Sequence, residues 1–357
     1  MKEVKELVAI SKYAGERFDL VQAAGGNSSV KLDSGEMLIK ASGYTLSDVT
    51  FDSGYSTVLT NDVANVLKNK ELLSSNNKRE RENITSALVK KATLDKNNRP
   101  SIETLLHSVL LKYTLHTHPI AVNVITALND YKQELKSIFK DVDVAYVDYE
   151  TPGIELAIKL DNEIKKFKNT PQIIFLQNHG LIVTSNKIED IEALTESVLD
   201  KIINHFELKG LLKYGTTNKI SKLLNSVEKN KNISYLCQDS FLNDLLLNKK
   251  ELFLKPPFCP DTLVYCGVKA VEIDSYEDKN TIINYKNNYY ELPKVIICDK
   301  EIFFIAPTLK KVREIEEVFK IHIMILNFNY NRDVVYLEND ELAYLSNWEA
   351  EKYRQNL

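Results

Sequence analysis

The sequence is poor in several features that mark particular classes of protein. Only four of its 357 residues are cysteine, and we interpret these as reduced thiols rather than a disulfide framework. Basic residues number 46 against 50 acidic ones, so no nucleic-acid partner is expected. No apolar run reaches about 18 residues, so no transmembrane span and no membrane partner are expected. We therefore expect a cytoplasmic protein with the composition of an ordinary enzyme, long enough to form two domains.

Histidine is also scarce, with six residues in the whole chain, and three of them lie in two short motifs. His116 and His118 are two positions apart, so on a strand their side chains point to the same face. With His179 they make three imidazoles, which is the ligand number of catalytic zinc sites that keep one position open. Taken alone, the first pair is more typical of an ordinary strand.

The surroundings of His179 favour the metal site. The segments 172–176 and 181–183 are apolar and rich in β-branched residues, as buried strands are. The polar segment Gln177-Asn178-His179-Gly180 interrupts them. Polar groups between buried strands are costly unless a partner satisfies them, and a metal ion is one such partner.

A third motif contains a carboxylate. Pro100 and Ser101 are typical of a helix start, and we expect a helix from Ser101 to about residue 111. Glu103 and His107 would then share one face of that helix. Glu103 could belong to the site, or it could be a first-turn residue that interacts with the helix dipole. Both readings stay open at this point.

Two glycine-containing segments, 25–29 and 40–43, suit an anion. Paired glycines beside Asn27 and hydroxyl groups allow backbone N–H groups to approach a phosphate closely. Each segment alone is also typical of an ordinary turn. The chain has neither a dinucleotide-binding glycine motif nor a Walker-type loop, so nucleotide binding by those routes is not supported.

Together these motifs resemble the class II aldolase/adducin family. The resemblance is closest to the aldolase part of rhamnulose-1-phosphate aldolase/dehydrogenase-type proteins, and it extends to segment 147–157 and to the C-terminal stretches 336–338 and 346–352. The motifs occur in the family's order, as Gly25-Gly26-Asn27-Ser28-Ser29, Lys40-Ala41-Ser42-Gly43, Pro100-Ser101-Ile102-Glu103, His116-Thr117-His118-Pro119 and Asn178-His179-Gly180. Ile102 departs from the short family members, which carry a second serine there.

The resemblance implies an α/β fold, a three-layer αβα class II aldolase-like domain with a smaller C-terminal α+β domain. We place the metal-dependent catalytic domain at residues 1–225 and the accessory or oligomerisation domain at 235–357. A polar, Lys/Asn-rich linker is expected around 218–232. In the C-terminal part we expect strands at 263–265, 289–292, 295–297 and 302–306, a helix over 308–326, and His322 as a packed helix residue.

The resemblance also implies the activity. A divalent-metal-dependent aldolase, a zinc-dependent aldehyde-lyase, would cleave or form a C–C bond in a small phosphorylated ketose through a metal-stabilised enediolate. A homotetramer is the favoured oligomer. The residues with implied roles are Glu103 as the general base; His116, His118 and His179 as ligands of Zn²⁺ or another divalent metal; Gly26, Asn27, Ser42, Gly43 and Ser101 for the phosphate; and His107 and Asn178 as supporting residues.

Other functions remain open. The family also contains sugar-phosphate epimerases and a dehydratase, which use related chemistry. From a different class, an adducin-like binding or assembly module would have the fold without catalysis, and a sugar-binding module would bind metal and ligand without turnover. Retention of all three histidines argues against the adducin-like reading.

Overall fold

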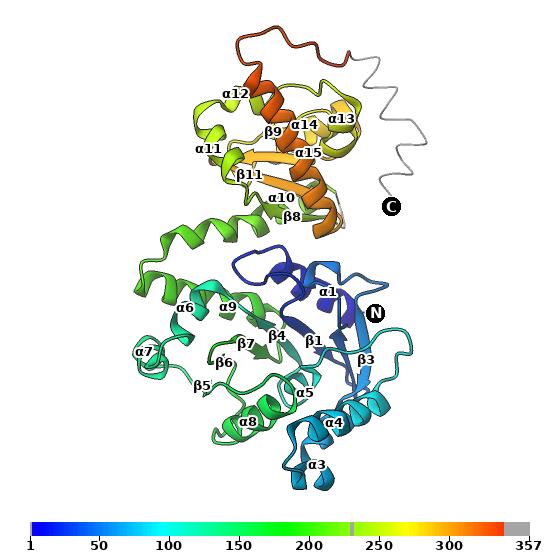
Figure 1. The fold of residues 1–357 in the computed structure, drawn as a ribbon, viewed down its shortest axis with the longest axis vertical. Coiled ribbons are helices and arrows are strands. Elements are labelled where there is room, and N and C mark those ends of the chain that lie inside the picture. Colours follow the sequence, from blue (N-terminus) through cyan, green and yellow to red (C-terminus); the bar gives the residue numbers. More distant parts are fainter. Residues whose placement is uncertain (1, 229–231, 339–357) are drawn as a thin grey trace. The chain divides into compact units, whose positions relative to one another are not determined.

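The computed structural model describes residues 2–228 and 232–338 (Figure 1). The chain divides into two compact units, Met1–Leu212 and Lys213–Leu357. Each unit has its own sheet. The C-terminal stretch 346–352, which takes part in the family resemblance, lies outside the described residues.

Seven strands of the described residues form the sheet of the first unit, in the order β3-β2-β1-β4-β7-β6-β5. Neighbouring strands are antiparallel except β5 and β6, which are parallel. Strand β4 is central, and all five of its residues are buried. The strands are β1 (Asn27–Lys31), β2 (Glu36–Lys40), β3 (Tyr55–Leu59), β4 (Tyr113–Thr117), β5 (Val144–Val147), β6 (Ile173–Leu176) and β7 (Gly180–Ser185).

Helices cover both faces of this sheet, which makes three layers (Figure 1). Successive strand residues enter opposite cores: Phe175 and Val183 belong to one hydrophobic cluster, Ile174 and Ile182 to the other. The helices of the first layer are α1 (Lys2–Gly15), α6 (Ile120–Thr126), α7 (Tyr131–Ile138) and α9 (Glu189–His205). Those of the second are α2 (Thr60–Asn65), α3 (Lys70–Ser74), α4 (Lys78–Ala92), α5 (Thr104–Ser108) and α8 (Ile154–Ile164). Short 3₁₀ turns lie at Leu46–Asp48, Val66–Lys68 and Lys209–Gly215.

The helix predicted from Ser101 to about residue 111 is shorter in the structure, as α5 covers only Thr104–Ser108. At its start, the Ser101 hydroxyl accepts a hydrogen bond from the backbone N–H of Glu103 at 3.2 Å. Past its end, the N–H of Leu111 donates to the Thr184 hydroxyl at 3.0 Å instead of continuing the helix. Bonds to serine and to strand β7 therefore replace helical bonds at both ends.

The second unit contains a smaller sheet, so the predicted α/β fold with a smaller C-terminal α+β domain is confirmed. Four strands of its described residues are ordered β8-β11-β10-β9, with β9 and β10 parallel. Its elements are α10 (Thr216–Val227), β8 (Ile233–Leu236), α11 (Ser240–Asn248), α12 (Lys250–Phe253), α13 (Pro260–Cys266), β9 (Val271–Glu272), α14 (Lys279–Tyr289), β10 (Val295–Cys298), β11 (Glu301–Ala306) and α15 (Leu309–Phe328). The four cysteines all lie in this described part and are free.

The linker predicted around 218–232 is wrong over most of its length, because α10 occupies Thr216–Val227. Ile220, Leu223 and Leu224 are buried in the core of the second unit, whereas Lys219 and Lys222 are exposed. The Lys/Asn-rich composition thus reflects the outer face of an amphipathic helix. The structural boundary accordingly falls at Leu212, before the position predicted from composition.

Two predicted strands in the second unit are helical or irregular instead. Residues 263–265 belong to α13. This helix has Pro260 in its first turn and ends before Gly267, whose φ is +79°. Tyr289 ends α14, and Tyr290 follows in a left-handed conformation. Short apolar runs do not distinguish strand from helix, and here proline and glycine set the helix. The predicted strands at 295–297 and 302–306 and the final helix are confirmed.

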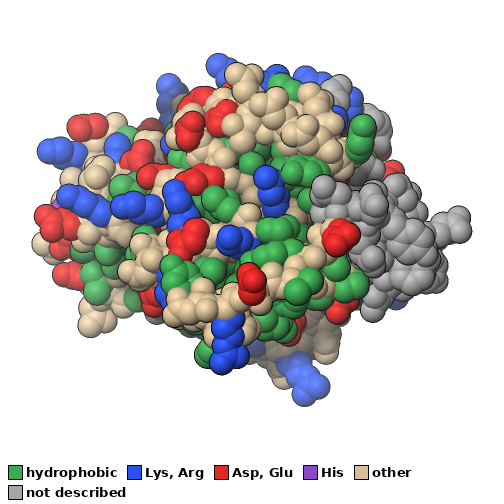
Figure 2. All heavy atoms as spheres, turned by 90° about the horizontal axis from the view of Figure 1, so that it is seen from above, with side chains coloured by type: hydrophobic (Ala, Val, Ile, Leu, Met, Phe, Trp, Pro, Cys, Tyr) green, Lys and Arg blue, Asp and Glu red, His purple; other side chains and the backbone are tan. Residues whose placement is uncertain are grey.

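His322 is a packed helix residue, as predicted, since it is buried and its ring stacks on Phe258 with centroids 5.1 Å apart. Among the described helices, none combines the length and the apolar character needed to cross a lipid bilayer. On the face shown in Figure 2, acidic and basic side chains are interspersed, with apolar side chains between them.

Candidate metal centre

Three histidine side chains converge on one point in the first unit. Nε2 of His116 lies 3.1 Å from Nε2 of His118 and 3.3 Å from Nε2 of His179. The ligand atoms of the three residues all lie within 4.8 Å of one another. Nitrogens bound to one tetrahedral zinc at about 2.0–2.1 Å are about 3.3 Å apart. The spacing of the His116 nitrogen from its two neighbours therefore fits a zinc-sized ion.

The pairing of β4 with β7 brings the histidines together across 63 positions of sequence. His116 is on β4, opposite Ile182 of β7, and His118 follows directly after β4. His179 is in the tight turn between β6 and β7. Asn178 in that turn has a φ of +52°, and its N–H donates to the carbonyl of Thr126 at 3.2 Å. The backbone of Asn178 thus shapes the turn that presents His179.

The ring of His116 is held in a form that suits metal binding. Its Nδ1 lies 3.0 Å from the carbonyl oxygen of Leu181, so Nδ1–H donates and Nε2 keeps its lone pair. Burial lowers the pKa of His116 to about 3, and it also lowers the pKa of His118. These two imidazoles are therefore neutral near pH 7, which is the form that binds metal ions.

Glu103 completes the cluster. Its Oε1 lies 3.2 Å from Nε2 of His179 and 3.6 Å from Nε2 of His116. Its other oxygen, Oε2, accepts a hydrogen bond from the side-chain amide of Asn27. Burial raises the pKa of the Glu103 carboxyl, but the electrostatic interaction with the nearby His116 ring and a hydrogen bond from His179 outweigh burial and hold that pKa well below its usual range. Glu103 is therefore a buried carboxylate whose Oε1 faces the place where the three histidine side chains converge.

Glycines allow the backbone to pass close to the histidines. A Cβ on Gly25 would lie 2.9 Å from Nδ1 of His118, and one on Gly26 would lie 2.8 Å from the carbonyl oxygen of His116. A Cβ on Gly180 would collide with the carbonyl oxygen of Thr117. These close approaches require glycine whatever ligand the site binds.

Lys40 is a charged residue near the site to which the sequence analysis assigned no role. Only 3% of its surface is exposed, and its Nζ donates to the carbonyl oxygens of Tyr44 at 2.7 Å and Ala24 at 3.3 Å. Burial lowers its pKa to about 8, and Glu103 acts in the opposite direction. Lys40 thus ties together the two predicted phosphate loops and places a positive charge beneath them. A lysine at the end of a strand, with backbone carbonyls as partners, gives little signal in sequence.

The residues predicted to contact a phosphate fall into two groups. Asn27 and Ser101 are buried beside Glu103, and Asn27 Oδ1 has no hydrogen-bond partner among the described residues. Ser42 and Gly43 are exposed on the loop after β2, and Gly43 has a φ of +87° with open space around it. Gly26 is buried against the backbone of His116. The exposed loop is thus the part accessible to a ligand, while Asn27 donates to the carboxylate of Glu103 and Ser101 accepts from the backbone N–H of Glu103.

His107 does not belong to the histidine triad. It is completely buried on α5, and its Nδ1 lies 2.7 Å from the hydroxyl of Ser29 on β1. Its Nε2 has no hydrogen-bond partner among the described residues. Burial lowers its pKa to about 3, so the ring is neutral. Its hydrogen bond with Ser29 attaches α5, and hence the segment that carries Glu103, to the sheet.

Comparison with known proteins adds the family. A family model described as "Class II Aldolase and Adducin N-terminal domain" matches residues 5–200. A protein of Bacillus subtilis (strain 168), "Uncharacterized oxidoreductase YuxG", is 27% identical over 231 residues, which cover 60% of this chain and 32% of that protein. The matched part of the chain thus spans about a third of this curated relative.

Solved structures resemble the first unit. The N-terminal class II aldolase domain of a conserved protein from Thermoplasma acidophilum matches with a TM-score of 0.49 and 25% identity, covering 57% of this chain and 93% of that one. A sugar-phosphate aldolase from Thermotoga maritima matches with a TM-score of 0.40 and 16% identity, covering 58% and 96%.

Proposed function

Because this chain belongs to the class II aldolase and adducin family through residues 5–200, we propose that it is a metal-dependent aldolase acting on a small phosphorylated ketose. One observation carries the proposal: a carboxylate oxygen of Glu103 and the Nε2 atoms of three histidines converge in a largely buried space. Converging lone pairs repel one another unless a cation lies between them. The same cluster contains a base beside that cation.

The residues present fit a divalent ion. His116, His118 and His179 would hold it, and a set of three imidazoles suits zinc better than magnesium or calcium. When bound, such an ion supplies a Lewis acid that stabilises negative charge developing on a substrate oxygen. The backbone carbonyl of Leu181 keeps His116 oriented as a ligand.

Glu103 is the proposed general base. Its Oε1 faces the histidine cluster and, in the cleavage direction, would take a proton from the substrate hydroxyl as the C–C bond breaks and then deliver it to the carbon that keeps the electron pair. Asn27 holds Oε2 by donating its amide N–H, so the carboxylate is fixed in one orientation. The depressed pKa keeps the free carboxylate charged near neutral pH. Glu103 is thus both oriented and ionised for proton transfer.

A phosphate group would be bound at the loops that Lys40 joins. Ser42 and Gly43 lie exposed on one loop, and Gly26 and Asn27 lie on the other. The buried ammonium of Lys40 donates to carbonyls of both loops, so its charge supports an anion at their surface. Ser101 lies beside Glu103 and would connect this anion site to the base.

Related functions differ in their products. An epimerase of the same family would return a ketose phosphate of altered configuration, and a dehydratase would release water. An adducin-like module would bind or assemble without turnover. Zinc as the metal and a homotetramer remain predictions from the resemblance. A cytoplasmic location and the roles of the domains placed at 1–225 and 235–357 remain predictions from the sequence.

The function is tested on the full chain purified without chelator. We expect about one divalent metal per chain and cleavage of at least one ketose 1-phosphate, detected as dihydroxyacetone phosphate by mass spectrometry. Glu103→Gln should keep the metal and lower turnover at least ~100-fold, whereas the control Glu134→Gln, at a half-buried position outside the cluster, should match wild type. Retained activity in Glu103→Gln would refute the base assignment. An epimer or a dehydrated product would replace the aldolase assignment.

A further inference from the structure

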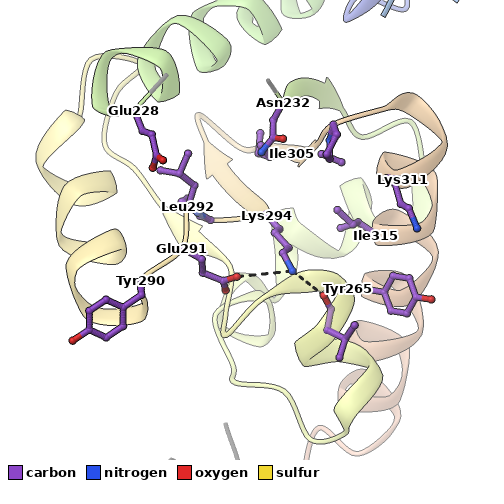
Figure 3. A pocket seen from close by; sticks show the side chains of 14 residues that line it. Glu228, Asn232, Tyr265, Tyr290, Glu291, Leu292, Lys294, Ile305, Lys311 and Ile315 are labelled. Atoms are coloured by element: carbon purple, nitrogen blue, oxygen red, sulfur yellow. Dashed lines mark hydrogen bonds and ion pairs between the residues drawn. The ribbon is translucent and has the colours of Figure 1, made fainter. Parts of the chain in front are cut away.

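The second unit contains a cavity that the proposed aldolase chemistry does not use. Its volume is about 450 Å³, within the range of small-molecule sites. It lies between α13, the segment before β10, the end of β11 and the start of α15, and Figure 3 shows the side chains that line it. Much of the wall is apolar, including Val264, Leu292, Pro293, Ile305, Ala306 and Ile315.

A lysine provides a polar group in this apolar wall. Nζ of Lys294 donates to the carbonyl oxygen of Val264 at 2.7 Å. Glu291 Oε2 lies 3.9 Å from the same Nζ, which is an ion-pair distance but too long for a hydrogen bond. Figure 3 shows Lys294 reaching between these two partners. An ammonium group has three N–H donors, so donors remain for a ligand in the cavity.

The acidic residues of the wall are held by other groups. Glu228 forms an ion pair with Lys286 at 2.7 Å. Glu291 accepts the backbone N–H of Val268 at 3.4 Å through Oε1. Each acidic side chain of the wall therefore has a partner other than Lys294.

The start of α15 adds to the positive potential. Pro307 is part of the wall, and the 20-residue helix begins two positions later at Leu309. The N-terminus of a helix carries a partial positive charge that favours anions. Lys311, in the first turn, also lines the cavity, although it pairs with Glu314 at 3.0 Å. Lysine and helix terminus thus favour the same sign of ligand.

We propose that this cavity binds a small apolar carboxylate, with the carboxylate on Lys294 and the hydrocarbon part against the apolar wall. An uncharged apolar molecule would leave the N–H donors of Lys294 without partners, and a cation would face an ammonium group and a helix N-terminus. The carboxylate therefore matches both halves of the cavity.

Three eight-carbon ligands that differ only in the head group test the proposal by titration calorimetry of the full chain. Octanoate should bind at least about tenfold more tightly than octanol, the gain expected for a charge-assisted hydrogen bond. Octylamine should bind most weakly. Equal affinities, or tighter binding of octanol or octylamine, would overturn the proposal.

Variants locate the site. Lys294→Met keeps the apolar stem and should abolish the preference for octanoate over octanol, whereas Lys279→Met, an exposed lysine outside the cavity, should leave it unchanged. Circular dichroism checks that both variants are folded. If Lys294→Met does not fold, Glu291→Gln replaces it, because removal of the neighbouring negative charge should tighten octanoate binding. An unchanged preference in folded Lys294→Met, or weaker octanoate binding in Glu291→Gln, would contradict the assignment.

Discussion

Nδ1 of His116 and the carbonyl oxygen of Leu181 lie 3.0 Å apart, across the pairing of β4 with β7. This bond directs the lone pair of Nε2 toward His118 and His179. A backbone carbonyl in a central strand cannot be removed by substitution. The orientation of the His116 ring is therefore part of the fold itself.

The two buried histidines near Glu103 should separate cleanly by metal content. His116→Ala removes one of the three proposed ligands. It should retain less than about a tenth of the wild-type metal, because the two remaining histidines alone would hold the ion weakly. His107→Gln should keep about one metal per chain, because its visible partner is Ser29 and not the triad. It should lower the free energy of unfolding by about 1–3 kcal/mol through lost burial and bonding. Elemental analysis and urea unfolding measure both effects. Metal loss in folded His107→Gln would place that residue in the site.

The close approach of Gly25 to His118 predicts a selective defect. In Gly25→Ala the new Cβ would lie 2.9 Å from Nδ1 of His118, so the ring must shift. A displaced ligand should weaken metal affinity by about tenfold or more, which is the range seen when the support of a ligand is lost. Gly210→Ala is the control, because open space surrounds that glycine. Competition with a chromophoric chelator measures the affinities, and equal values for the two variants would show that the loop yields instead of the histidine.

Lys40 should contribute to the binding of anions and not to the binding of the metal. Lys40→Met should keep metal content but weaken binding of inorganic phosphate by about tenfold, the scale of one charged hydrogen bond. Lys31→Met is a matched control: Lys31 also donates to two backbone carbonyls, and burial lowers its pKa to about 8 as well. Both variants should lose stability, but calorimetry should show weaker phosphate binding only in Lys40→Met. The same loss in Lys31→Met would indicate a general effect on the fold.

The second unit should be sensitive to acid through His322. Burial lowers its pKa to about 4, from an ordinary value of 6.5. Between these values the unfolded chain binds a proton that the folded chain does not, so stability falls as the pH drops from about 6.5 to about 4 and then levels off. The maximum loss is about 3 kcal/mol for this side chain, which is 2% exposed. Hydrogen exchange of α15 at pH 7.5 and 4.5 should show this loss in wild type and a smaller one in His322→Leu. His205→Gln, at an exposed histidine of the first unit, should behave as wild type. If His322→Leu lost as much stability in acid as wild type does, His322 would not be the cause of the pH effect.

The convergence of the three histidines could be predicted because its signal is local. His116 and His118 are two positions apart at the end of one strand, and His179 interrupts two apolar segments, so residue type and spacing already indicate a shared face. The role of Lys40 could not be predicted, because its partners are backbone carbonyls of Ala24 and Tyr44. Such partners carry no residue signature and depend on long-range register.

The missed elements have a similar cause. Strand β3 (Tyr55–Leu59) alternates buried and half-buried residues at the edge of its sheet, and its serine and threonine hide the pattern. Helix α10 was predicted as a linker because its exposed Lys219, Lys222 and Asn225 give it a polar composition. In both cases a few buried side chains determine the structure, while the more numerous polar side chains determine the average composition of the segment.

The β4–β7 pairing would also make metal binding depend on correct folding. The two strands lie far apart in the chain, and only their native register places His179 beside His116 and His118. A misregistered sheet would shift a ligand away by one residue and onto the opposite face. An ion that needs all three imidazoles would then be retained by correctly assembled chains and lost by misfolded ones, so metal retention would select for native topology before any substrate arrives.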